Sequence, residues 1–384
     1  MSTQEETRYG LLGIIGMPGC EELVAQIDAY LQWRPAGQLS FLDDAYAGKN
    51  QSSIVQCKCP RFETGEAKGL ILESVRGYDL YIVSDVFNYG ETYQMYGQTV
   101  PMSPDDHYQD LKRIISAVGG KARRITVIMP MLYEGRQHRR FARESMDCAL
   151  ALQELAGMGV CNLITFDAHD ARVQNAIPMN GFENVRPCYQ MIKALLRECP
   201  DVRIDPEHLM VVSPDEGAMA RSIYYSTVLG VELGMFYKRR DYTNTVNGRN
   251  PIIAHGFLGD NIDGKDVIVV EDMISSGESM LDVVEDLKNL GAGRIFIFST
   301  FGLFCRGLES FDSAYEQGKF EKVFTTNLIY RSPELMDRLW YAEVDMSKFL
   351  AYIIDTLNRD RSISDLLEPV ARIKKLLAKH KGEA

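Results

Sequence analysis

Short apolar runs alternate with amphipathic stretches of helical period along most of this chain. Several runs are too continuously apolar for a strand that has one face in water, so they predict parallel strands with helices on both faces. This pattern is typical of α/β architecture with a doubly wound sheet. The expected strands are Leu11–Ile15, Asp79–Val83, Ile125–Met129, Leu163–Phe166, Leu209–Val212, Val267–Val270 and Ile295–Phe298. The expected helices are Glu21–Leu31, Tyr108–Ala117, Cys148–Met158, Met191–Glu198, Ser279–Leu290, Met346–Leu357 and Ile363–His380.

The size and charge of the chain limit the number of domains and the kinds of ligand that we expect. Its 384 residues exceed the ~250 that one hydrophobic core usually serves, which predicts roughly two domains. The net charge of −11 argues against a general nucleic-acid binder, because such proteins carry an excess of basic side chains. Positive charge for an anionic substrate must then be local, and Arg136–Arg143 and Lys238–Arg240 are the candidates.

Targeting signals and cysteine spacing indicate the compartment. Met1–Arg8 is polar, and no apolar run approaches the ~18–20 residues that a membrane-spanning helix needs. None of the eight cysteines forms a CxxC pair, and Cys57-Lys58-Cys59 has the wrong spacing for a usual zinc knuckle. Free thiols in a reducing compartment explain them better. We therefore expect a cytoplasmic protein without a membrane segment.

One internal repeat is visible, because residues 79–92 align without gaps with residues 266–279. It predicts two similar halves with a boundary near Met179–Pro187, although unrelated strand–turn–helix units can produce the same pattern. The first copy has Phe87 and Tyr89 where the second has Ile274 and Ser276. Bulky side chains would crowd a phosphate, so the second copy is the better candidate for a working site. The recurring residues are Asp79, Val83, Asp85, Gly90 and Glu91, which return as Asp266, Val270, Asp272, Gly277 and Glu278.

The second copy carries the strongest chemical pattern in the chain. Its apolar strand ends in Glu271 and Asp272, at the edge where ligands of open α/β sheets bind. Carboxylates there can accept hydrogen bonds from the hydroxyls of a sugar. The small-residue turn that follows opens a helix, whose free N–H groups and positive dipole end can hold a phosphate. The alternative is a plain N-capped helix with acidic residues in its first turn, but here the acidic pair precedes the turn. We therefore predict a site for a phosphorylated ribose, formed by Glu271, Asp272, Ser275, Ser276, Gly277, Glu278 and Ser279.

This segment resembles the phosphoribosyl-pyrophosphate loop of type I phosphoribosyltransferases and of ribose-phosphate diphosphokinases, also called phosphoribosyl pyrophosphate synthetases. Further segments resemble only the diphosphokinases, and they occur in that family's order from about Gly10 to Leu367. They are Phe62–Glu66 (the adenine-side loop), Gly135–Arg139 (a second ATP loop), Phe166–His169 (the Asp-x-His motif), Ser213–Gly217 (the Ser-Pro-Asp-x-Gly motif) and Lys238–Arg240 (the head of the catalytic loop).

The resemblance implies a fold and an activity. The fold would be two similar type I phosphoribosyltransferase-like domains, each a mainly parallel sheet flanked by helices. They would span residues 1–180, on the ATP side, and 181–342, with the sugar-phosphate loop, before a helical extension at 343–384. The activity would be Mg²⁺-dependent transfer of the diphosphoryl group of ATP to O1 of ribose 5-phosphate, giving phosphoribosyl pyrophosphate and AMP. A phosphoribosyltransferase, or a non-catalytic regulatory paralogue of the synthetase, is the alternative.

The resemblance also implies residue roles. Lys238, Arg240 and His169 would be catalytic, and His169 and Asp215 would hold Mg²⁺. ATP would contact Phe62, Thr64, Glu66, Arg136 and Gln137, in a homo-oligomer whose adenine site is completed by Phe62 of a neighbouring subunit. Such an assignment suits the chemistry, because diphosphoryl transfer needs positioning and charge neutralisation more than covalent help. Taken singly, the histidine would more often be structural and the basic triplet a solvated turn.

The chain departs from the family pattern in the sugar-phosphate loop. The synthetases usually carry Asp-Thr-x-Gly-Thr there, whereas Glu278 places a carboxylate at the position of their glycine. A carboxylate in the first turn of a helix is favoured by the helix dipole. We therefore expect the Glu278 side chain to point outward and to stabilise the helix that follows. Thr64 replaces the aspartate of the adenine-side loop, and Glu271 stands where the synthetases have aspartate.

Overall fold

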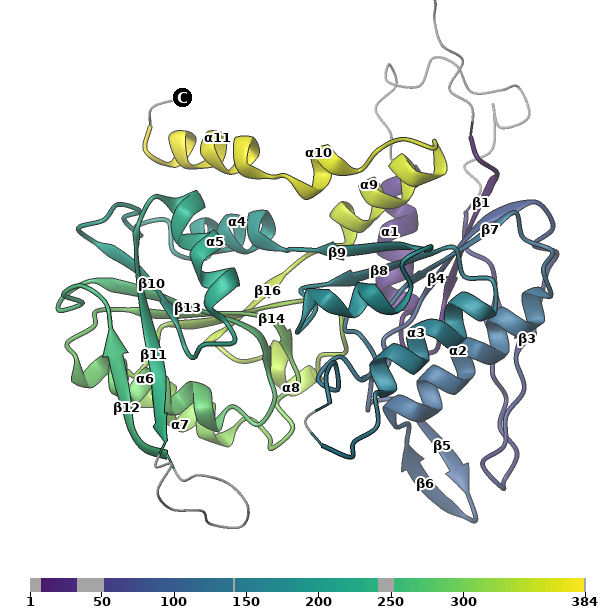
Figure 1. The fold of residues 1–384 in the computed structure, drawn as a ribbon, viewed down its shortest axis with the longest axis horizontal. Helices are drawn as coiled ribbons and strands as arrows, with labels where there is room; N and C mark the ends of the chain where they lie inside the picture. The colour runs from purple at the N-terminus through teal and green to yellow at the C-terminus, as the bar shows by residue number, and fades with distance from the viewer. Residues whose placement is uncertain (1–7, 33–51, 141, 241–251, 383–384) are drawn as a thin grey trace, which may run out of the picture. The chain divides into compact units, whose positions relative to one another are not determined.

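The computed structural model describes residues 8–32, 52–140, 142–240 and 252–382, with the side chains of 238–240 and 252–255 outside that description. The chain forms two compact units, each built around a sheet (Figure 1). One unit comprises Met1–Arg186, Asn327–Tyr330 and Asp345–Glu368. The other comprises Pro187–Thr326, Arg331–Val344 and Pro369–Ala384. No helix in the described part of the chain is long and apolar enough to cross a membrane.

The first unit has a five-stranded sheet in the order β1-β4-β7-β8-β9, with every neighbouring pair parallel. Helices α2 and α3 share a hydrophobic cluster with alternate residues of the strands, whereas α1 packs with α9. The strands are β1 (Leu11–Gly16), β4 (Tyr78–Val83), β7 (Arg124–Ile128), β8 (Asn162–Phe166) and β9 (Gly181–Val185). The helices are α1 (Glu21–Gln32), α2 (Pro104–Val118), α3 (Asp147–Gly157), α9 (Ser347–Asn358), α10 (Ser364–Leu367) and the short 3₁₀ helix Ala171–Ala176. Two antiparallel hairpins complete it, β2 (Cys57–Lys58) with β3 (Leu70–Ile71) and β5 (Thr92–Met95) with β6 (Gln98–Pro101).

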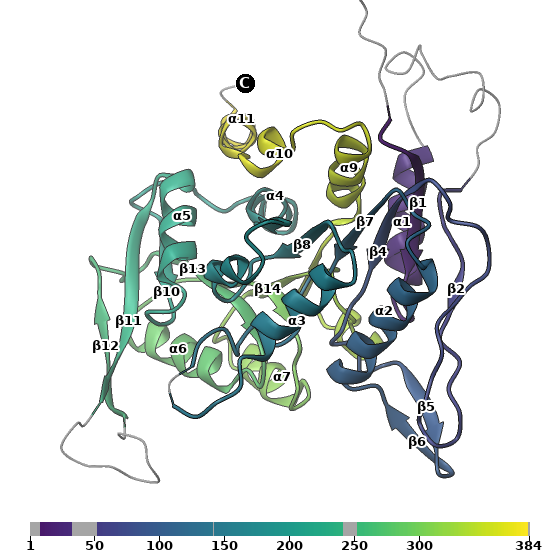
Figure 2. The ribbon, with the colours of Figure 1, turned by 45° about the vertical axis from the view of Figure 1, so that its right-hand side comes forward.

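The second unit has a seven-stranded sheet in the order β12-β11-β10-β13-β14-β15-β16, and only its edge strand β12 runs antiparallel to its neighbour. Helices α6 and α7 cover one face, and α4 and α5 cover the other (Figures 1 and 2). The strands are β10 (Leu209–Ser213), β11 (Glu232–Arg240), β12 (Ile252–Leu258), β13 (Asp266–Ile274), β14 (Ile295–Gly302), β15 (Lys322–Thr326) and β16 (Tyr341–Val344). The helices are α4 (Cys188–Glu198), α5 (Met219–Leu229), α6 (Glu278–Asn289), α7 (Glu309–Glu316), α8 (Pro333–Met336) and α11 (Val370–His380).

Two helices differ from the sequence prediction for local reasons. Helix α2 begins at Pro104, four residues before the expected start, because the Ser103 side chain accepts from the N–H of Asp106 and the Asp106 carboxylate accepts from the N–H of Ser103. Such a cap contributes about 0.5–2 kcal/mol. The single helix expected over Ile363–His380 is wrong, because Pro369 separates α10 from α11. A proline inside a helix removes a backbone donor and clashes with the preceding turn.

The compact units also differ from the domain ranges expected from the sequence. Strand β9 pairs with β8, so residues 181–186 complete the first sheet rather than open the second unit. Helix α9 packs on α1 in the first unit, whereas α11 packs on α4 in the second. Residues 343–384 are therefore not a separate extension, because the compact units divide them between the first and the second unit.

The internal repeat corresponds to the same ion pair in both sheets. In the first, Arg124 Nη2 lies 2.7 Å from Oδ2 of Asp79, directly across the β4–β7 pair. In the second, Arg294 Nη2 lies 2.7 Å from Oδ2 of Asp266, in the equivalent register between β13 and β14. The likeness ends after the loop, because α6 begins at Glu278 whereas the first copy continues into the β5–β6 hairpin.

Candidate active site

Strand β13 delivers two carboxylates to the carboxyl end of the second sheet. Val267–Val270 are buried, and Glu271 and Asp272 follow directly. Asp272 is 2% exposed, and the side chain of Glu271 is 20% exposed. Burial, and then the charge of Asp272, raise the pKa of Glu271 well above its usual range. The ionised form of this carboxyl therefore depends on a positive partner.

Arg221 is that partner, and the sequence analysis did not identify it. It lies in the first turn of α5, with Nη1 3.1 Å from Oε1 of Glu271 and Nη2 3.6 Å from Oδ2 of Asp272. Its side chain is only 10% exposed. The available signal was a basic residue at the start of the helix that follows the Ser-Pro-Asp-x-Gly motif, where the helix dipole disfavours a cation.

The turn after these carboxylates has a backbone shape that requires glycine. Gly277 has φ +87°, and a Cβ at this position would lie 2.2 Å from a ring carbon of Phe311. No side chain caps α6, so its first-turn N–H groups are left for a ligand or water. The geometry agrees with a phosphate-holding turn in which Ser275, Ser276 and Ser279 supply hydroxyls.

A neighbouring turn after β14 runs beside this loop. The N–H of Leu303 donates to the carbonyl of Ile274 at 2.9 Å, and the N–H of Cys305 donates to the carbonyl of Ser275 at 2.9 Å. These bonds place Arg306 against Glu278, and the two exposed side chains form an ion pair. The carboxylate that departs from the family pattern is thus compensated by a guanidinium. The exposure of the Glu278 side chain agrees with the outward orientation expected for it.

Asp215 lies at the same sheet edge as the two carboxylates, because β10 and β13 are parallel neighbours. Its Oδ1 accepts from the N–H groups of Gly217 at 2.9 Å and Ala218 at 3.2 Å. The Ser213 hydroxyl donates to the Asp215 carbonyl at 2.8 Å. Among the described residues, both bonds to the carboxylate use Oδ1, which leaves Oδ2 available for a hard cation such as Mg²⁺.

The first unit presents the adenine-side loop as a tight, braced turn. Phe62 donates its N–H to the Glu66 carbonyl at 2.7 Å and accepts from the N–H of Gly65 at 2.9 Å. The Thr64 hydroxyl donates to the Glu66 carboxylate at 3.0 Å. Phe62 is 57% exposed, so its ring can be reached by a ligand while the backbone is fixed.

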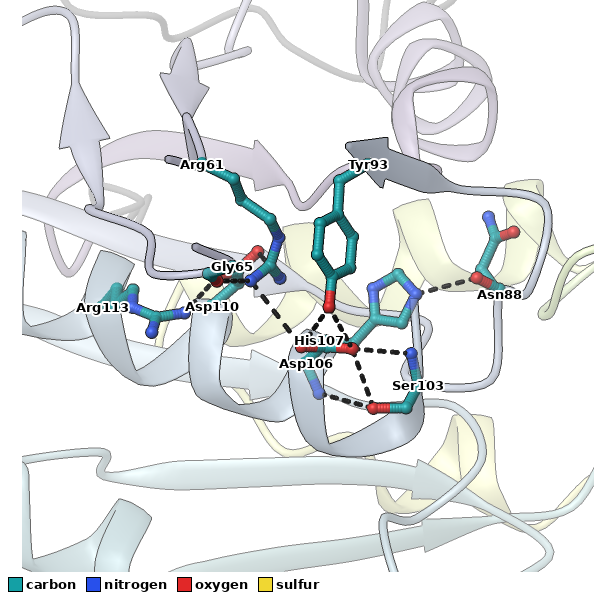
Figure 3. A network of polar contacts seen from close by, with 9 residues as sticks. All are labelled: Arg61, Gly65, Asn88, Tyr93, Ser103, Asp106, His107, Asp110 and Arg113. Carbon is teal, nitrogen blue, oxygen red and sulfur yellow. Dashed lines mark hydrogen bonds and ion pairs between the residues drawn. The ribbon is translucent and has the colours of Figure 1, made fainter. Parts of the chain in front are cut away.

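Arg61 fixes this loop to helix α2 (Figure 3). Its Nη1 donates to the Gly65 carbonyl at 3.1 Å, and its Nη2 lies 2.9 Å from the Asp110 carboxylate. The guanidinium also stacks 4.3 Å from the ring centroid of Tyr93. Burial raises the pKa of Asp110, and this is opposed by Arg61 and Arg113. A buried ion pair therefore holds the loop in place, a role that the resemblance did not assign to Arg61.

The loop with Arg136 and Gln137 meets the loop with His169 in the same unit. Gln137 donates to the Ser145 carbonyl at 3.0 Å. The ring of His138 lies 5.3 Å, centroid to centroid, from that of His169, and its Nε2 is 3.5 Å from Oδ2 of Asp170. The hydrogen bond from Arg172 lowers the pKa of Asp170, which also caps the following 3₁₀ helix. The two segments expected on the nucleotide side are thus neighbours.

The first copy of the repeat is filled by the chain itself. The N–H of Tyr330 donates to Oδ2 of Asp85 at 2.6 Å, and that of Phe87 donates to Oδ1 at 2.9 Å. A Cβ on Gly90 would lie 2.6 Å from the ring of Tyr330. Asp85 thus stabilises a closed loop, which is consistent with the interpretation that the second copy is the better candidate for a phosphate site.

The expected site residues are divided between the units. Phe62, Thr64, Glu66, Arg136, Gln137 and His169 belong to the first, and Asp215, Lys238, Arg240 and Glu271–Ser279 belong to the second. Lys238 and Arg240 end strand β11, and their side chains lie outside the description, as does the stretch 241–251. The described residues contain no group of three or more His, Cys, Asp or Glu side chains arranged for a metal ion.

The fold and the glycine turn define the class of protein. Each unit is a mainly parallel sheet flanked by helices, and the second carries carboxylates, turn and helix in type I phosphoribosyltransferase fashion. Two family descriptions match, the N-terminal domain of ribose phosphate pyrophosphokinase over residues 12–159 and the phosphoribosyl transferase domain over residues 182–309. The chain belongs to the ribose-phosphate pyrophosphokinase family.

Similar proteins span most of the chain. A ribose-phosphate pyrophosphokinase from Vibrio cholerae is 27% identical over 318 residues, covering 81% of this chain and 91% of that protein. One from Thermotoga maritima is 29% identical over 281 residues, covering 71% and 79%. A phosphoribosylpyrophosphate synthetase structure from Mycobacterium smegmatis has a TM-score of 0.71 at 20% identity, covering 91% of this chain and 99% of that one, and supports the fold. The predicted family, fold and enzyme class are confirmed.

Proposed function

We propose that this protein transfers the diphosphoryl group of ATP to O1 of ribose 5-phosphate, giving phosphoribosyl pyrophosphate and AMP. The observation that carries the proposal is the segment Glu271–Ser279, in which two carboxylates precede a turn that only glycine can form at the open start of a helix. A phosphorylated sugar needs both parts. The carboxylates accept from its hydroxyls, and the helix start receives its phosphate.

The nucleotide is assigned to the first unit. Phe62 offers an exposed ring for adenine, and Arg136 and Gln137 offer donors for the nucleotide. Thr64 and Glu66 form the polar side of the same turn. The 57% exposure of Phe62 supports the proposal that a second copy of the chain completes the adenine site in a homo-oligomer.

Charge neutralisation is assigned to four side chains. We assign Lys238 and Arg240 to the charge that develops on the transferring group. We assign His169 and Asp215 to Mg²⁺, which when bound neutralises phosphate oxygens. The donor set fits, since Asp215 retains Oδ2 and the ATP phosphates supply further oxygens. A cytoplasmic location, without a nucleic-acid or membrane partner, agrees with the net charge of −11 and completes the proposal.

The experiment is to incubate the purified protein with ATP, Mg²⁺ and ribose 5-phosphate and to separate the nucleotide products. We expect AMP in amounts equal to the sugar product, and none when ribose 5-phosphate is omitted. ADP as the product would show a simple kinase and overturn the proposal. No turnover, together with stimulation of a true synthetase on mixing, would establish the regulatory paralogue instead.

A further inference from the structure

Arg221 is a buried cation at the start of a helix, where its position needs an explanation. A guanidinium in the first turn of α5 faces the positive end of the helix dipole, which disfavours it. Its side chain is 10% exposed, so solvent does little to compensate. It contacts Glu271 and Asp272, the two carboxylates that the proposed function assigns to the sugar.

Two hydrogen bonds orient the carboxyl group of Glu271. Oε1 accepts from Nη1 of Arg221 at 3.1 Å and from the N–H of Asp272 at 2.9 Å. Both of these bonds fix the Oε1 side of the carboxyl group. The side chain of Asp272 is oriented from two sides, since Oδ1 accepts from the N–H of Met273 at 2.8 Å and Oδ2 lies 3.6 Å from Nη2 of Arg221. One planar fork thus reaches both carboxylates at once.

We propose that Arg221 is a positioning residue that orients Glu271 and Asp272 toward the ring hydroxyls of ribose 5-phosphate and so sets the discrimination against 2-deoxyribose 5-phosphate. The inference rests on the proposed function of this site. Two adjacent buried carboxylates repel each other, and burial already raises the pKa of Glu271. Without the guanidinium, one of them would take up a proton or turn away, and its acceptor for a hydroxyl would be lost. An acceptor aimed at one hydroxyl separates a sugar that has it from one that lacks it.

Arg294, which immediately precedes β14, provides a matched control because its partner Asp266 lies on the same strand as Glu271 and Asp272. It forms the ion pair with Asp266 at the opposite end of β13, with Nη2–Oδ2 at 2.7 Å, and it is remote from the carboxyl-end loop. Arg294→Gln removes a guanidinium–carboxylate pair from the sheet without touching the proposed sugar site. A purely structural role for Arg221 predicts that Arg221→Gln and Arg294→Gln behave alike.

The test uses the full chain and its variants. Titration calorimetry measures the binding of ribose 5-phosphate and of 2-deoxyribose 5-phosphate. Steady-state kinetics give KM for ribose 5-phosphate and KM for ATP. For Arg221→Gln we expect a rise of about tenfold or more in Kd and KM for ribose 5-phosphate. KM for ATP should stay within twofold, and the preference for ribose over deoxyribose should fall by a similar factor. Arg221→Lys, which keeps the charge but not the fork, should recover part of the affinity and little of the preference. Arg294→Gln should lower thermal stability only.

An unchanged sugar preference in both Arg221 variants, with the loss of stability seen for Arg294→Gln, would overturn the inference. If Arg221→Gln does not fold, Arg221→Lys and its preference ratio decide alone. Failure of the proposed function has a different signature, namely no AMP from the unmodified protein. The calorimetric comparison needs no turnover, so it still decides the role of Arg221 in that case.

Discussion

Gly277→Ala perturbs the sugar-phosphate turn at its most constrained position. Two separate costs follow from the structure. The residue has φ +87°, a left-handed conformation that costs an L-residue roughly 1–2 kcal/mol. Its new Cβ would lie 2.2 Å from Phe311, whose side chain is fully buried, so the turn or the ring must move. Overpacking of this kind typically costs a further ~1–3 kcal/mol.

Gly264→Ala separates the two costs. Gly264 has φ +76°, but nothing lies within 4 Å of the position of its added Cβ, so only the backbone cost applies. We expect about 1–2 kcal/mol of destabilisation for Gly264→Ala and about 2–5 kcal/mol for Gly277→Ala in urea unfolding without ligands. Gly277→Ala should also raise KM for ribose 5-phosphate, which Gly264→Ala should not. Equal destabilisation by the two substitutions would refute the steric cost that we assign to contact between the new Cβ and Phe311.

Three further predictions concern charged groups of the site. Glu278→Gly should change KM for ribose 5-phosphate by no more than a few-fold, because the carboxylate is exposed and already paired with Arg306. It should slightly lower the melting temperature, through the loss of a favourable charge at the helix start and the entropy cost of glycine. A tenfold fall in KM, worth about 1.4 kcal/mol, would show that the carboxylate faces the phosphate. Asp215→Ala should sharply raise the Mg²⁺ concentration needed for half-maximal turnover, and an unchanged requirement would exclude it as a ligand. Lys238→Ala and Arg240→Ala should each lower kcat by about 10²–10³ with little change in KM, as for a lost donor to developing charge; a variant that raised only KM would be a binding group.

The fold was predictable where local pattern and burial agree. Continuously apolar runs such as Val267–Val270 predict strands covered on both faces, and this run is a buried part of β13. Strands with polar residues were missed. Strand β11 ends in three basic residues and pairs with the antiparallel edge strand β12, so its pattern does not resemble that of a buried parallel strand. The start of α2 depended on the Ser103–Asp106 cap, a signal that is present in the sequence but was not used.

The parts of the site that lie within one sequence motif were predictable. The turn Ser275–Gly277 follows from residue types and spacing, since small residues before a helix define a phosphate turn. Arg221 and Arg61 were not foreseen, because each acts through a partner that is distant in the sequence, Glu271 and Asp110. Pairing across elements is a product of the fold, and residue spacing within one segment does not reveal it.

In the proposed reaction the β- and γ-phosphoryl groups leave ATP together. Parallel single-turnover reactions with ATP labelled in the α- or in the γ-phosphate, in the presence of ribose 5-phosphate and Mg²⁺, follow each label into its product. We expect the α-label to leave in AMP and the γ-label to move to the sugar product. Recovery of the α-label in ADP, with the γ-label on the sugar, would contradict it.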